Sequence, residues 1–547
     1  MKNKIFALIL VFAGLQACSM DTVNLTQIDS ATYPKSEDDY SSLLISVYTN
    51  AAYTKMAHQH PYLVSELNSD QRFGGGGLHD INVEGLNLFK LASNDMLENC
   101  WTNRYTGIYQ ANFILEKLAE NETLDQETKN QISGQAHFLR AYLYMDLARM
   151  FEKVPLILTT NQPDEIKQDE PAVIWAQIFT DLNAAIAELP NQTYQEMPAD
   201  NDGDATKWAA ESLMARAYLF YTGFYELDAA PLNEGGTLTK TEVVNYVDDC
   251  VANSGHQLLS DFRNYWPYSV SDKDYGYAKA YNLKWVDEFH SNPECVWATK
   301  YNGFGDREST ANTLLLAMGM RDQTQVPFGK GWGYGTVNPQ TWENWPDNDL
   351  RKVASIYSVE NEKEWVSGYK KAVSQADETG YWQKKYMPIN MYDADHKATG
   401  YATVLYGAYN KFTMNTAQDL TLIRFSDVLL MGAELGSSHA QEYLDKVRSR
   451  VNLPAVPVTL DNIKTERNHE LAFEGIRYYD LLRWHDAEAA FAKVKEVPIE
   501  SGGVATTMTI NYRKDTRGFM PIPETEISLA NGGIVQNPGW TSAEAAW

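Results

Sequence analysis

The feature that most constrains this chain is a series of apolar stripes at helical spacing in its first half. Apolar side chains recur every three or four residues along 101–115, and the same spacing returns at 132–147, 174–189 and 213–224. This spacing places them on one face of an α-helix. Short polar breaks such as 190–198 separate the stretches, and helices joined in this way stack as antiparallel pairs. We therefore predict an all-α, mainly helical fold of tetratricopeptide-like helix pairs, although no regular repeat period is visible.

The middle of the chain lacks this regularity. Residues 255–420 are rich in Trp, Tyr, Gly and Asn and show weak periodicity, which predicts long loops, short strands and a few helices. Long ordered loops in a compact protein commonly carry function, so we expect the ligand-binding region here. Helical spacing returns at about 420–451 and 461–484, and the segment 518–523 is predicted to be extended.

The first residues have the pattern of a bacterial export signal. A short basic head at 1–4 precedes an almost wholly apolar stretch at 5–15, which is too short to span a membrane as a stable helix. The residues that follow resemble a lipobox, the site of lipid attachment: Leu15-Gln16-Ala17-Cys18. We expect 1–17 to be a signal peptide and Cys18 to carry the lipid, whose acyl chains suffice for stable anchoring. The alternative is an ordinary signal peptide with an incidental cysteine.

The chain is strongly acidic. It contains 46 Lys and Arg against 72 Asp and Glu, and loss of the two lysines in 1–17 changes the formal net charge from −26 to −28. A field of this sign repels nucleic acid and anionic membrane surfaces. No later stretch of the sequence has the roughly 18 uninterrupted apolar residues of a membrane-spanning helix. We therefore predict attachment to a membrane through lipid alone and no nucleic acid partner.

Three further cysteines follow the lipobox, at Cys100, Cys250 and Cys295. An odd number allows at most one disulfide bond, and the sequence does not say which pair would form it. The sequence has no Cys-x-x-Cys motif and no Cys/His cluster with zinc spacing. We expect these residues to be buried structural cysteines, and we expect no cofactor.

Several segments, in the correct order along the chain, resemble the SusD/RagB family of surface lipoproteins. The strongest is 467–484, which reads RNHELAFEGIRYYDLLRW and is similar to the family's main motif nearly position for position. The others are similar to its N-terminal helix signature, a helix start, its IRYAEVLLMYAE helix and its closing segment: 134–142 with Pro155 and Leu156, 205–207, 422–431, and 521–527 with 536–540.

The resemblance implies an all-α fold with tetratricopeptide-like helix pairs and a loop-rich ligand-binding lobe. It implies a SusD-like N-terminal domain at 18–230, a RagB/SusD domain at 231–547, and an outward-facing anchor on the outer membrane. The implied partner is a SusC-like TonB-dependent transporter. Family ligands are mostly glycans, and in the RagB branch peptides, so we expect an oligosaccharide and keep a peptide as the alternative. Residues 255–420 match no family motif, so the sequence does not name the sugar, its linkage or its length.

One predicted helix carries two carboxylates a single turn apart, Glu470 and Glu474. Glycan-degrading enzymes use such a pair. However, Arg467 and Arg477 each stand three residues from one of the carboxylates, which would keep both ionised and unfit as a general acid. We therefore interpret these residues as an ion-pair network in the core, and we predict a binding protein that is not an enzyme.

Two glycine-rich loops are the candidate ligand-binding elements. Four consecutive glycines in the first loop, 70–80, let the backbone pass close to a bulky group. Sugars need an aromatic face for stacking and polar side chains that bind neighbouring hydroxyl groups. The first loop supplies such side chains, and the second, 329–335, supplies two rings: Asp70, Arg72, Phe73 and Asp80, then Trp332 and Tyr334.

This hypothesis requires the two loops, about 260 positions apart, to meet at one exposed cleft. The alternative for the first loop is a flexible tip with a structural turn. Trp266 and Trp345 are further candidates, although tryptophans in loops often fill the core instead. Capture before import requires release, so we expect micromolar to millimolar affinity, about −4 to −8 kcal/mol.

A weak calcium pattern precedes the fourth apolar stripe. Asp200, Asp202 and Asp204 stand before Glu211 at the offsets of ligands in a calcium loop. The glycine that such a loop needs at its sixth position is replaced by Ala205. We therefore expect an acidic surface loop here and keep calcium as the alternative.

Overall fold

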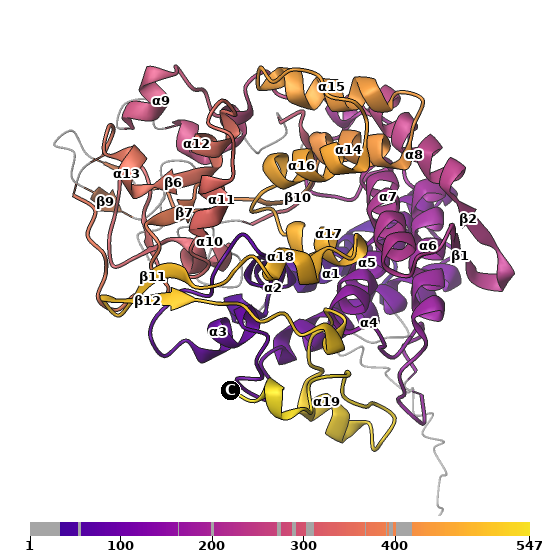
Figure 1. Cartoon of the computed structure of the whole chain (residues 1–547). Helices are drawn as coiled ribbons and strands as arrows, with labels where there is room; N and C mark the ends of the chain where they lie inside the picture. Colours follow the sequence, from indigo (N-terminus) through magenta and orange to yellow (C-terminus); the bar gives the residue numbers. More distant parts are fainter. Residues whose placement is uncertain are drawn as a thin grey trace, which may run out of the picture.

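Long helices from the first half of the chain occupy the right-hand side of Figure 1, and loop-rich segments occupy the left. The computed structural model describes residues 33–52, 56–161, 163–198, 202–270, 275–286, 292–301, 311–366, 368–389, 391–392, 398–400 and 418–547. The predicted signal peptide and Cys18 lie outside these residues.

The four apolar stripes form four consecutive helices, and one more helix extends the row on each side. These are α1 (Glu37–Ala52), α4 (Glu98–Glu120), α5 (Gln126–Phe151), α6 (Pro171–Glu188), α7 (Lys207–Phe224) and α8 (Lys240–Asn253). Each helix from α4 to α8 packs against the next, and α1 packs on α4 and α5. The predicted all-α fold with tetratricopeptide-like helix pairs is confirmed.

Local sequence signals fix where these helices begin. The Asp125 side chain accepts a hydrogen bond from Thr128 N and caps α5. Thr206 caps α7 in the same way by accepting from Ala209 N. Pro171 is the first residue of α6, where its missing N–H costs nothing. Each cap satisfies a main-chain donor that the helix itself leaves without a partner.

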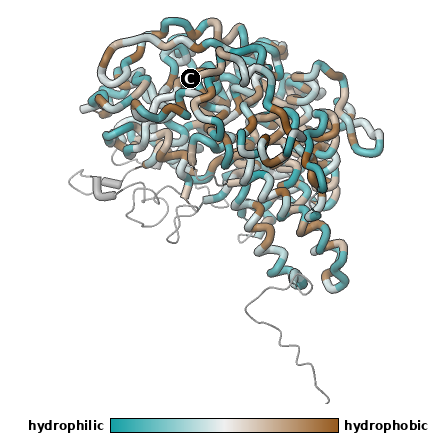
Figure 2. Tube along the Cα trace, turned by 90° about the horizontal axis from the view of Figure 1, so that it is seen from below, coloured by the Kyte–Doolittle hydropathy of each residue, from teal (hydrophilic) through white to brown (hydrophobic). Residues whose placement is uncertain are grey.

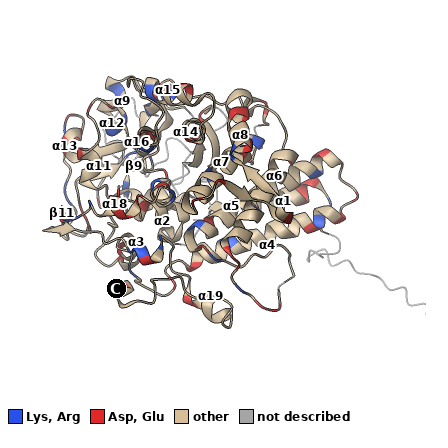
Figure 3. Cartoon of the chain, turned by 45° about the vertical axis from the view of Figure 1, so that its right-hand side comes forward, with Lys and Arg blue, Asp and Glu red and all other residues tan. Residues whose placement is uncertain are grey.

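The helices bury their apolar faces in one large core. Figure 2 shows hydrophobic and hydrophilic stretches alternating along the chain, as expected where each helix turns one face inward. Figure 3 shows acidic and basic residues interspersed along the helices and loops. Cys100 and Cys250 are buried, Cys295 is half-buried, and all three are free thiols. Among the described helices, none combines the length and the apolar character needed to cross a bilayer.

The two later helical stretches are shorter than predicted, so that part of the prediction is wrong. The segment 420–451 contains β10 (Leu420–Arg424), α14 (Phe425–Leu435) and α15 (Ala440–Arg450). Gly436 adopts a left-handed conformation with φ 77°, which ends α14 and separates it from α15. The segment 461–484 is divided between α16 (Leu460–Glu470) and α17 (Arg477–Arg483). Phe473 and Gly475, with φ values of 64° and 72°, turn the chain between them.

Short elements make up the rest of the described chain. Its remaining helices are α2 (Pro61–Leu67), α3 (Ile81–Asn87), α9 (Gly276–Ala280), α10 (Thr313–Met318), α11 (Pro339–Glu343), α12 (Arg351–Ser355), α13 (Val359–Glu362), α18 (Ala487–Phe491) and α19 (Glu524–Leu529). The described strands pair two by two: β1 (Ala229–Pro231) with β2 (Thr237–Thr239), β3 (Cys295–Thr299) with β10, β4 (Met320–Arg321) with β5 (Lys330–Gly331), β6 (Ile356–Ser358) with β7 (Tyr381–Gln383), β8 (Met391–Tyr392) with β9 (Ala398–Gly400), and β11 (Val497–Ser501) with β12 (Val504–Met508).

Candidate functional site

Two backbone segments from distant parts of the sequence, 72–77 and 332–337, lie side by side and form the paired loops. Main-chain hydrogen bonds join them at three places: Phe73 N to Thr336 O (2.8 Å), Gly335 N to Gly74 O (2.8 Å) and Gly76 N to Gly333 O (2.6 Å). The two loops therefore meet, which is one part of the sequence hypothesis. The exposed cleft that the hypothesis also requires stays a prediction. Ligand binding by these loops stays a prediction.

Glycines make this close approach possible. Gly75 and Gly333 have φ values of 68° and 83°, a conformation that other residues rarely adopt. A Cβ on Gly75 would overlap the Gly333 carbonyl oxygen, and a Cβ on Gly333 would overlap the side-chain oxygen of Gln375. The glycines are thus needed for the contact between the two loops and do not form a free tip.

Two aromatic rings stand at the surface of the paired loops. Trp332 and Tyr334 are half-buried, and their ring centroids are 6.1 Å apart with the planes tilted by 57°. The Tyr334 ring lies against Gly76, where a Cβ would come within 2.7 Å of two ring carbons. Two adjacent rings that are only partly buried form an arrangement on which a sugar can stack.

Opposite charges flank these rings. Arg321 donates to the Trp332 carbonyl oxygen (2.9 Å) and to Ser374 Oγ (3.0 Å), and Asp80 accepts from Gly77 N (2.6 Å). Burial and the charge of Asp80, opposed by Arg321, together raise the pKa of Tyr334 to about 12. The Tyr334 hydroxyl is therefore neutral at physiological pH and can both donate and accept a hydrogen bond.

The structure corrects the roles predicted for Arg72 and Phe73, since both side chains are fully buried. Arg72 pairs with Glu66 (2.5 Å) and donates to the Gly335 carbonyl oxygen (2.9 Å). A guanidinium group that is buried and paired in this way stabilises the core and cannot meet a ligand at the surface. The Phe73 ring is also part of the buried core and cannot contact a ligand at the surface.

Three more candidates have structural partners. Asp70 is half-buried and accepts two 2.8 Å hydrogen bonds from Arg477. Trp266 is fully buried, and Trp345, only 2% exposed, stacks on His469 at 4.6 Å. The predicted ligand roles of the two tryptophans are therefore wrong, and both fill the core. Of the eight predicted residues, Trp332, Tyr334 and Asp80 are left together at the surface.

The structure adds residues that the sequence analysis did not select. Arg321 lies beside the paired loops, and its guanidinium group would be 2.9 Å from a Cβ on Gly77. Leu78 is 50% exposed and neighbours Gly502 in the turn of the β11–β12 hairpin. Its place directly after four glycines was a usable signal for Leu78. No local pattern in the sequence identifies Arg321, although its strand β4 pairs with β5 at the start of the second loop.

An acidic pair lies beneath the first loop. Asp377 is buried and accepts a hydrogen bond from Gly75 N (3.0 Å). Burial, and then the charges of the nearby Asp377 and Asp80, together raise the pKa of Glu84 to about 7. Glu84 therefore changes its charge close to neutral pH, directly below the candidate surface.

Two described members of the calcium pattern, Asp202 and Glu211, pair with different lysines. Asp202 pairs with Lys300 (2.7 Å), whereas Glu211 is buried in α7 and pairs with Lys207 (3.5 Å). Asp200 lies outside the described residues. In the part of the chain that the structure describes, no group of three or more His, Cys, Asp or Glu side chains is arranged to hold a metal ion.

Glu470 and Glu474 lie in a buried ion-pair network, as expected, but with different partners and geometry. Glu470 ends α16, whereas Glu474 lies in the following turn, so the two do not occupy successive turns of one helix. The partners are Arg351, Arg424, Arg450 and Lys385, while Arg467 and Arg477 pair with other acids. Burial alone would raise the pKa of Glu470, but the surrounding arginines hold it well below its usual value.

Comparison with known proteins identifies two matching family models. The model of the SusD family matches residues 252–540. A model described as starch-binding and associating with the outer membrane matches residues 24–219. SusD-like protein P2 from Formosa agariphila is 22% identical over 498 residues, which cover 85% of this chain and 86% of that protein.

Solved structures have the same fold. A laminarin-binding SusD-like protein is 25% identical, with a TM-score of 0.69 over 92% of this chain and 100% of the other. Surface glycan-binding protein A from Bacteroides thetaiotaomicron, solved in complex with laminarihexaose, is 20% identical, with a TM-score of 0.68 over 91% of this chain and 99% of the other.

Proposed function

The chain belongs to the SusD family, and on that premise we propose that it is a cell-surface lipoprotein that binds oligosaccharides. In this proposal the protein delivers its ligand to a SusC-like TonB-dependent transporter and catalyses no reaction. Two of its structural relatives are glycan-binding proteins by name, and one of them was solved with laminarihexaose.

One observation carries the proposal of a glycan site at the paired loops. Trp332 and Tyr334 present adjacent, half-buried rings, with Arg321 and Asp80 beside them. Stacking on a ring together with a few hydrogen bonds to hydroxyl groups gives modest affinity, in the micromolar to millimolar range. Such affinity suits a protein that must release its ligand for import.

Absence of catalysis is proposed from the state of the carboxylates. Glu470 and Glu474 are buried and bonded to cationic side chains, so neither can reach the glycosidic bond of a ligand at the surface. Incubation of the protein with oligosaccharides should release no new reducing ends. Release of reducing ends by the purified chain, at a rate proportional to its concentration, would overturn this part of the proposal.

The ligand site is tested by calorimetry with oligosaccharides, including laminarihexaose, on the wild type and on Trp332→Ala. We expect binding by the wild type and at least a tenfold loss of affinity in the variant. Trp484→Ala is the matched control, because Trp484 is also half-buried but donates from Nε1 to Glu434 in α14 (2.8 Å) and is not part of the paired loops. Equal affinity in all three proteins would show that the ligand does not bind at the paired loops. Binding of peptides but of no oligosaccharide would favour the RagB-like alternative.

The lipid anchor is tested at Cys18. The protein with Cys18→Ser should take up no labelled fatty acid and should separate from the membrane fraction. Cys250→Ser is the control, since Cys250 is buried in α8 and should have no part in lipid attachment. Equal labelling of both variants would contradict the lipobox interpretation.

A further inference from the structure

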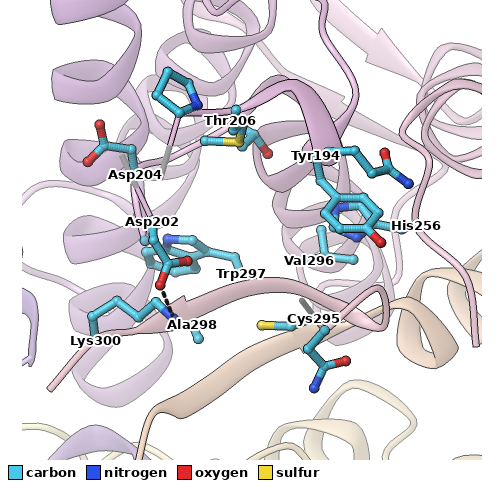
Figure 4. A pocket seen from close by; sticks show the side chains of 15 residues that line it. Tyr194, Asp202, Asp204, Thr206, His256, Cys295, Val296, Trp297, Ala298 and Lys300 are labelled. Atoms are coloured by element: carbon cyan, nitrogen blue, oxygen red, sulfur yellow. Dashed lines mark ion pairs between the residues drawn. The ribbon is translucent and has the colours of Figure 1, made fainter. Parts of the chain in front are cut away.

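An apolar groove of about 400 Å³ lies along α4 and shares no residue with the paired loops. Three aromatic rings at four-residue spacing on α4 and three isoleucines from later segments form most of it: Trp101, Tyr105, Tyr109, Ile157, Ile166 and Ile534. This volume is within the range of roughly 300–1,000 Å³ that is usual for ligand sites. The smaller cavity in Figure 4, about 200 Å³, differs because Asp202 and Lys300 at its edge are already bonded to each other.

The inner rings of the groove are fixed in place. The Tyr105 hydroxyl donates to the Pro155 carbonyl oxygen (2.7 Å), and the Tyr105 ring lies 5.2 Å from that of Trp101. Trp101 is only 3% exposed and also meets the Phe151 ring edge-on at 5.2 Å. This part of the groove is therefore formed before any partner binds, so that little free energy is lost in ordering it.

Large apolar side chains remain exposed in and beside the groove. Tyr109 is 46% exposed, and Val535, which follows the lining residue Ile534, is 64% exposed. Leu529, one turn after Glu526 in α19, is 67% exposed. Exposed apolar side chains around an apolar groove mark a place where another molecule binds. Tyr and Trp are also the residues that protein interfaces use most often in excess of the ordinary surface.

Carboxylates are grouped at the end of the groove next to α19. Glu526 lines the groove, and Asp95 accepts a hydrogen bond from Thr525 N (3.1 Å) directly beside it. Burial raises the pKa of Glu526, and the charges of Glu98 and Asp95 raise it further. A cationic group at this end of the groove would therefore stabilise the ionised form of Glu526.

The wall around Ile166 is acidic as well. Asp164 and Glu165 are exposed directly before Ile166, and Asp169 follows three residues after it. Lys167, also exposed, is the basic residue of this stretch. Together with the carboxylates next to α19 these acids form the acidic rim of the groove: Asp95, Glu98, Asp164, Glu165, Asp169 and Glu526.

We propose that the apolar groove docks a segment of a partner protein that places apolar side chains on the rings of α4 and Lys or Arg side chains against the acidic rim. The rim repels an anionic lipid surface, and it also repels a second copy of this chain, whose net charge is −26. A neutral glycan could contact the rings but would leave the carboxylates without a counter-charge. The partner is identified by its chemistry, so the inference depends neither on the oligosaccharide site nor on the transporter.

The test places a photoreactive residue in the groove, Tyr109→benzoylphenylalanine, in the full chain in native cells. Illumination should attach a segment of another protein at this position, and mass spectrometry should show that the segment has a net positive charge and an apolar face. The matched control is Tyr281→benzoylphenylalanine, because Tyr281 is 52% exposed but does not line the groove. The control should not attach the same segment.

A second arm measures the two parts of the interaction with a synthetic peptide of the attached sequence. We expect Tyr109→Ala to weaken its binding at least tenfold, because an exposed ring at the centre of the contact is lost. Glu526→Gln should weaken binding at least threefold and reduce its dependence on salt. Tyr281→Ala and Glu127→Gln are the controls, since both residues are exposed outside the groove, and they should bind as the wild type does. Thermal unfolding of each variant identifies any loss of fold.

Several outcomes would overturn the proposal. One is that position 109 attaches no protein, or attaches only lipid, glycan or another copy of this chain. Another is that the attached segment has no net positive charge. A third is that the peptide does not bind the wild type, or that it binds either folded variant, Tyr109→Ala or Glu526→Gln, as tightly as the wild type. Failure to recover a transporter complex would leave this inference standing and would count against the proposed function instead.

Discussion

Glu470 is fully buried among arginines that come from three separate parts of the chain. Arg351 and Arg424 lie 3.0 and 2.9 Å from its carboxylate oxygens, and Arg450 also pairs with it. Replacement by Gln keeps the size of the side chain but leaves buried guanidinium groups without their counter-charge. We predict that Glu470→Gln lowers the free energy of unfolding by about 3–5 kcal/mol, measured by urea denaturation.

The control for this variant is Glu488→Gln, because Glu488 is exposed on α18 and its nearest cation, Lys514, is 3.6 Å away. It should leave the unfolding midpoint unchanged. If both variants are equally stable, the network around Glu470 contributes no net stability. Folded Glu470→Gln protein should still bind ligand as the wild type does, since Glu470 does not reach the surface.

Glu84 gives the protein a pH dependence near neutrality. Its pKa is about 7 in the folded state, against an ordinary value of 4.5, because of burial and then of Asp377 and Asp80. Below pH 4.5 the carboxyl is protonated in both states. Between pH 4.5 and 7 the unfolded state ionises first, so wild-type stability falls as the pH rises and the full cost is present above pH 7.

Glu84→Gln should remove this cost. We predict that the melting temperature of the variant exceeds that of the wild type at pH 8, by on the order of 1–3 °C, and equals it at pH 4.5. Glu127→Gln, at an exposed position in α5, serves as the control and should show the same difference from the wild type at both pH values. A difference for Glu84→Gln that does not change with pH would contradict the assignment.

The partners of individual charged residues could not be predicted from the sequence. Spacing along a helix suggested that Arg467 and Arg477 pair with Glu470 and Glu474, yet they pair with Asp480 and Asp70 instead. Sequence spacing identifies neighbours on one helix, whereas buried charged groups pair with the opposite charges that lie nearest in the folded structure. For the same reason the sequence could suggest Arg72 for the ligand site, but it could not show that the Arg72 guanidinium group is bonded to Glu66 and to the Gly335 carbonyl oxygen.

Among the elements, the paired loops depend on glycine at Gly75. An alanine there would need a positive φ and would also place its Cβ against the Gly333 carbonyl oxygen. We predict that Gly75→Ala both destabilises the protein and weakens oligosaccharide binding at least tenfold, because the loops must separate. Urea denaturation and calorimetry measure the two effects.

Gly503→Ala is a closely matched control for this variant. Gly503 has φ 76°, close to the 68° of Gly75, but a Cβ there would only touch Val373 at 3.7 Å. It should cost about 1–2 kcal/mol for the backbone conformation alone and leave ligand affinity unchanged. Equal affinity in both variants would mean that the contact between the loops does not support the binding surface.

The long helices were predictable, and the connections were not. Caps and apolar spacing are local properties, so α4 to α7 follow from the sequence. The break after α16 depends on Phe473 and Gly475, and a Cβ on Gly475 would come within 2.7 Å of the Tyr62 ring. That ring is more than 400 positions away in the sequence, so no local pattern could reveal the constraint. The contact between the two glycine-rich loops was predicted only as a requirement of the proposed function.

For the whole molecule, the modest affinity proposed above has a consequence for the proposed delivery to a transporter. A ligand bound with a dissociation constant of about 0.1 mM and an association rate constant of 10⁵–10⁷ M⁻¹s⁻¹ leaves in roughly 1–100 ms. A ligand released from an isolated surface protein diffuses away from the cell. Release is useful only where the transporter is already attached, since a tethered pair keeps the effective concentration of ligand near the millimolar range.

We therefore predict a stable complex with a large TonB-dependent barrel protein. Outer membranes solubilised in mild detergent should yield both chains when the lipoprotein is captured by an affinity tag, and a structure of the complex should bury more than about 2,000 Å². A similarly tagged, unrelated lipoprotein from the same membranes is the control and should recover no barrel protein. Recovery of this chain alone, under conditions in which the barrel remains folded, would show that hand-over occurs by collision. In that case the ligand affinity should be tighter than micromolar, because the bound state must then outlast the search for a transporter.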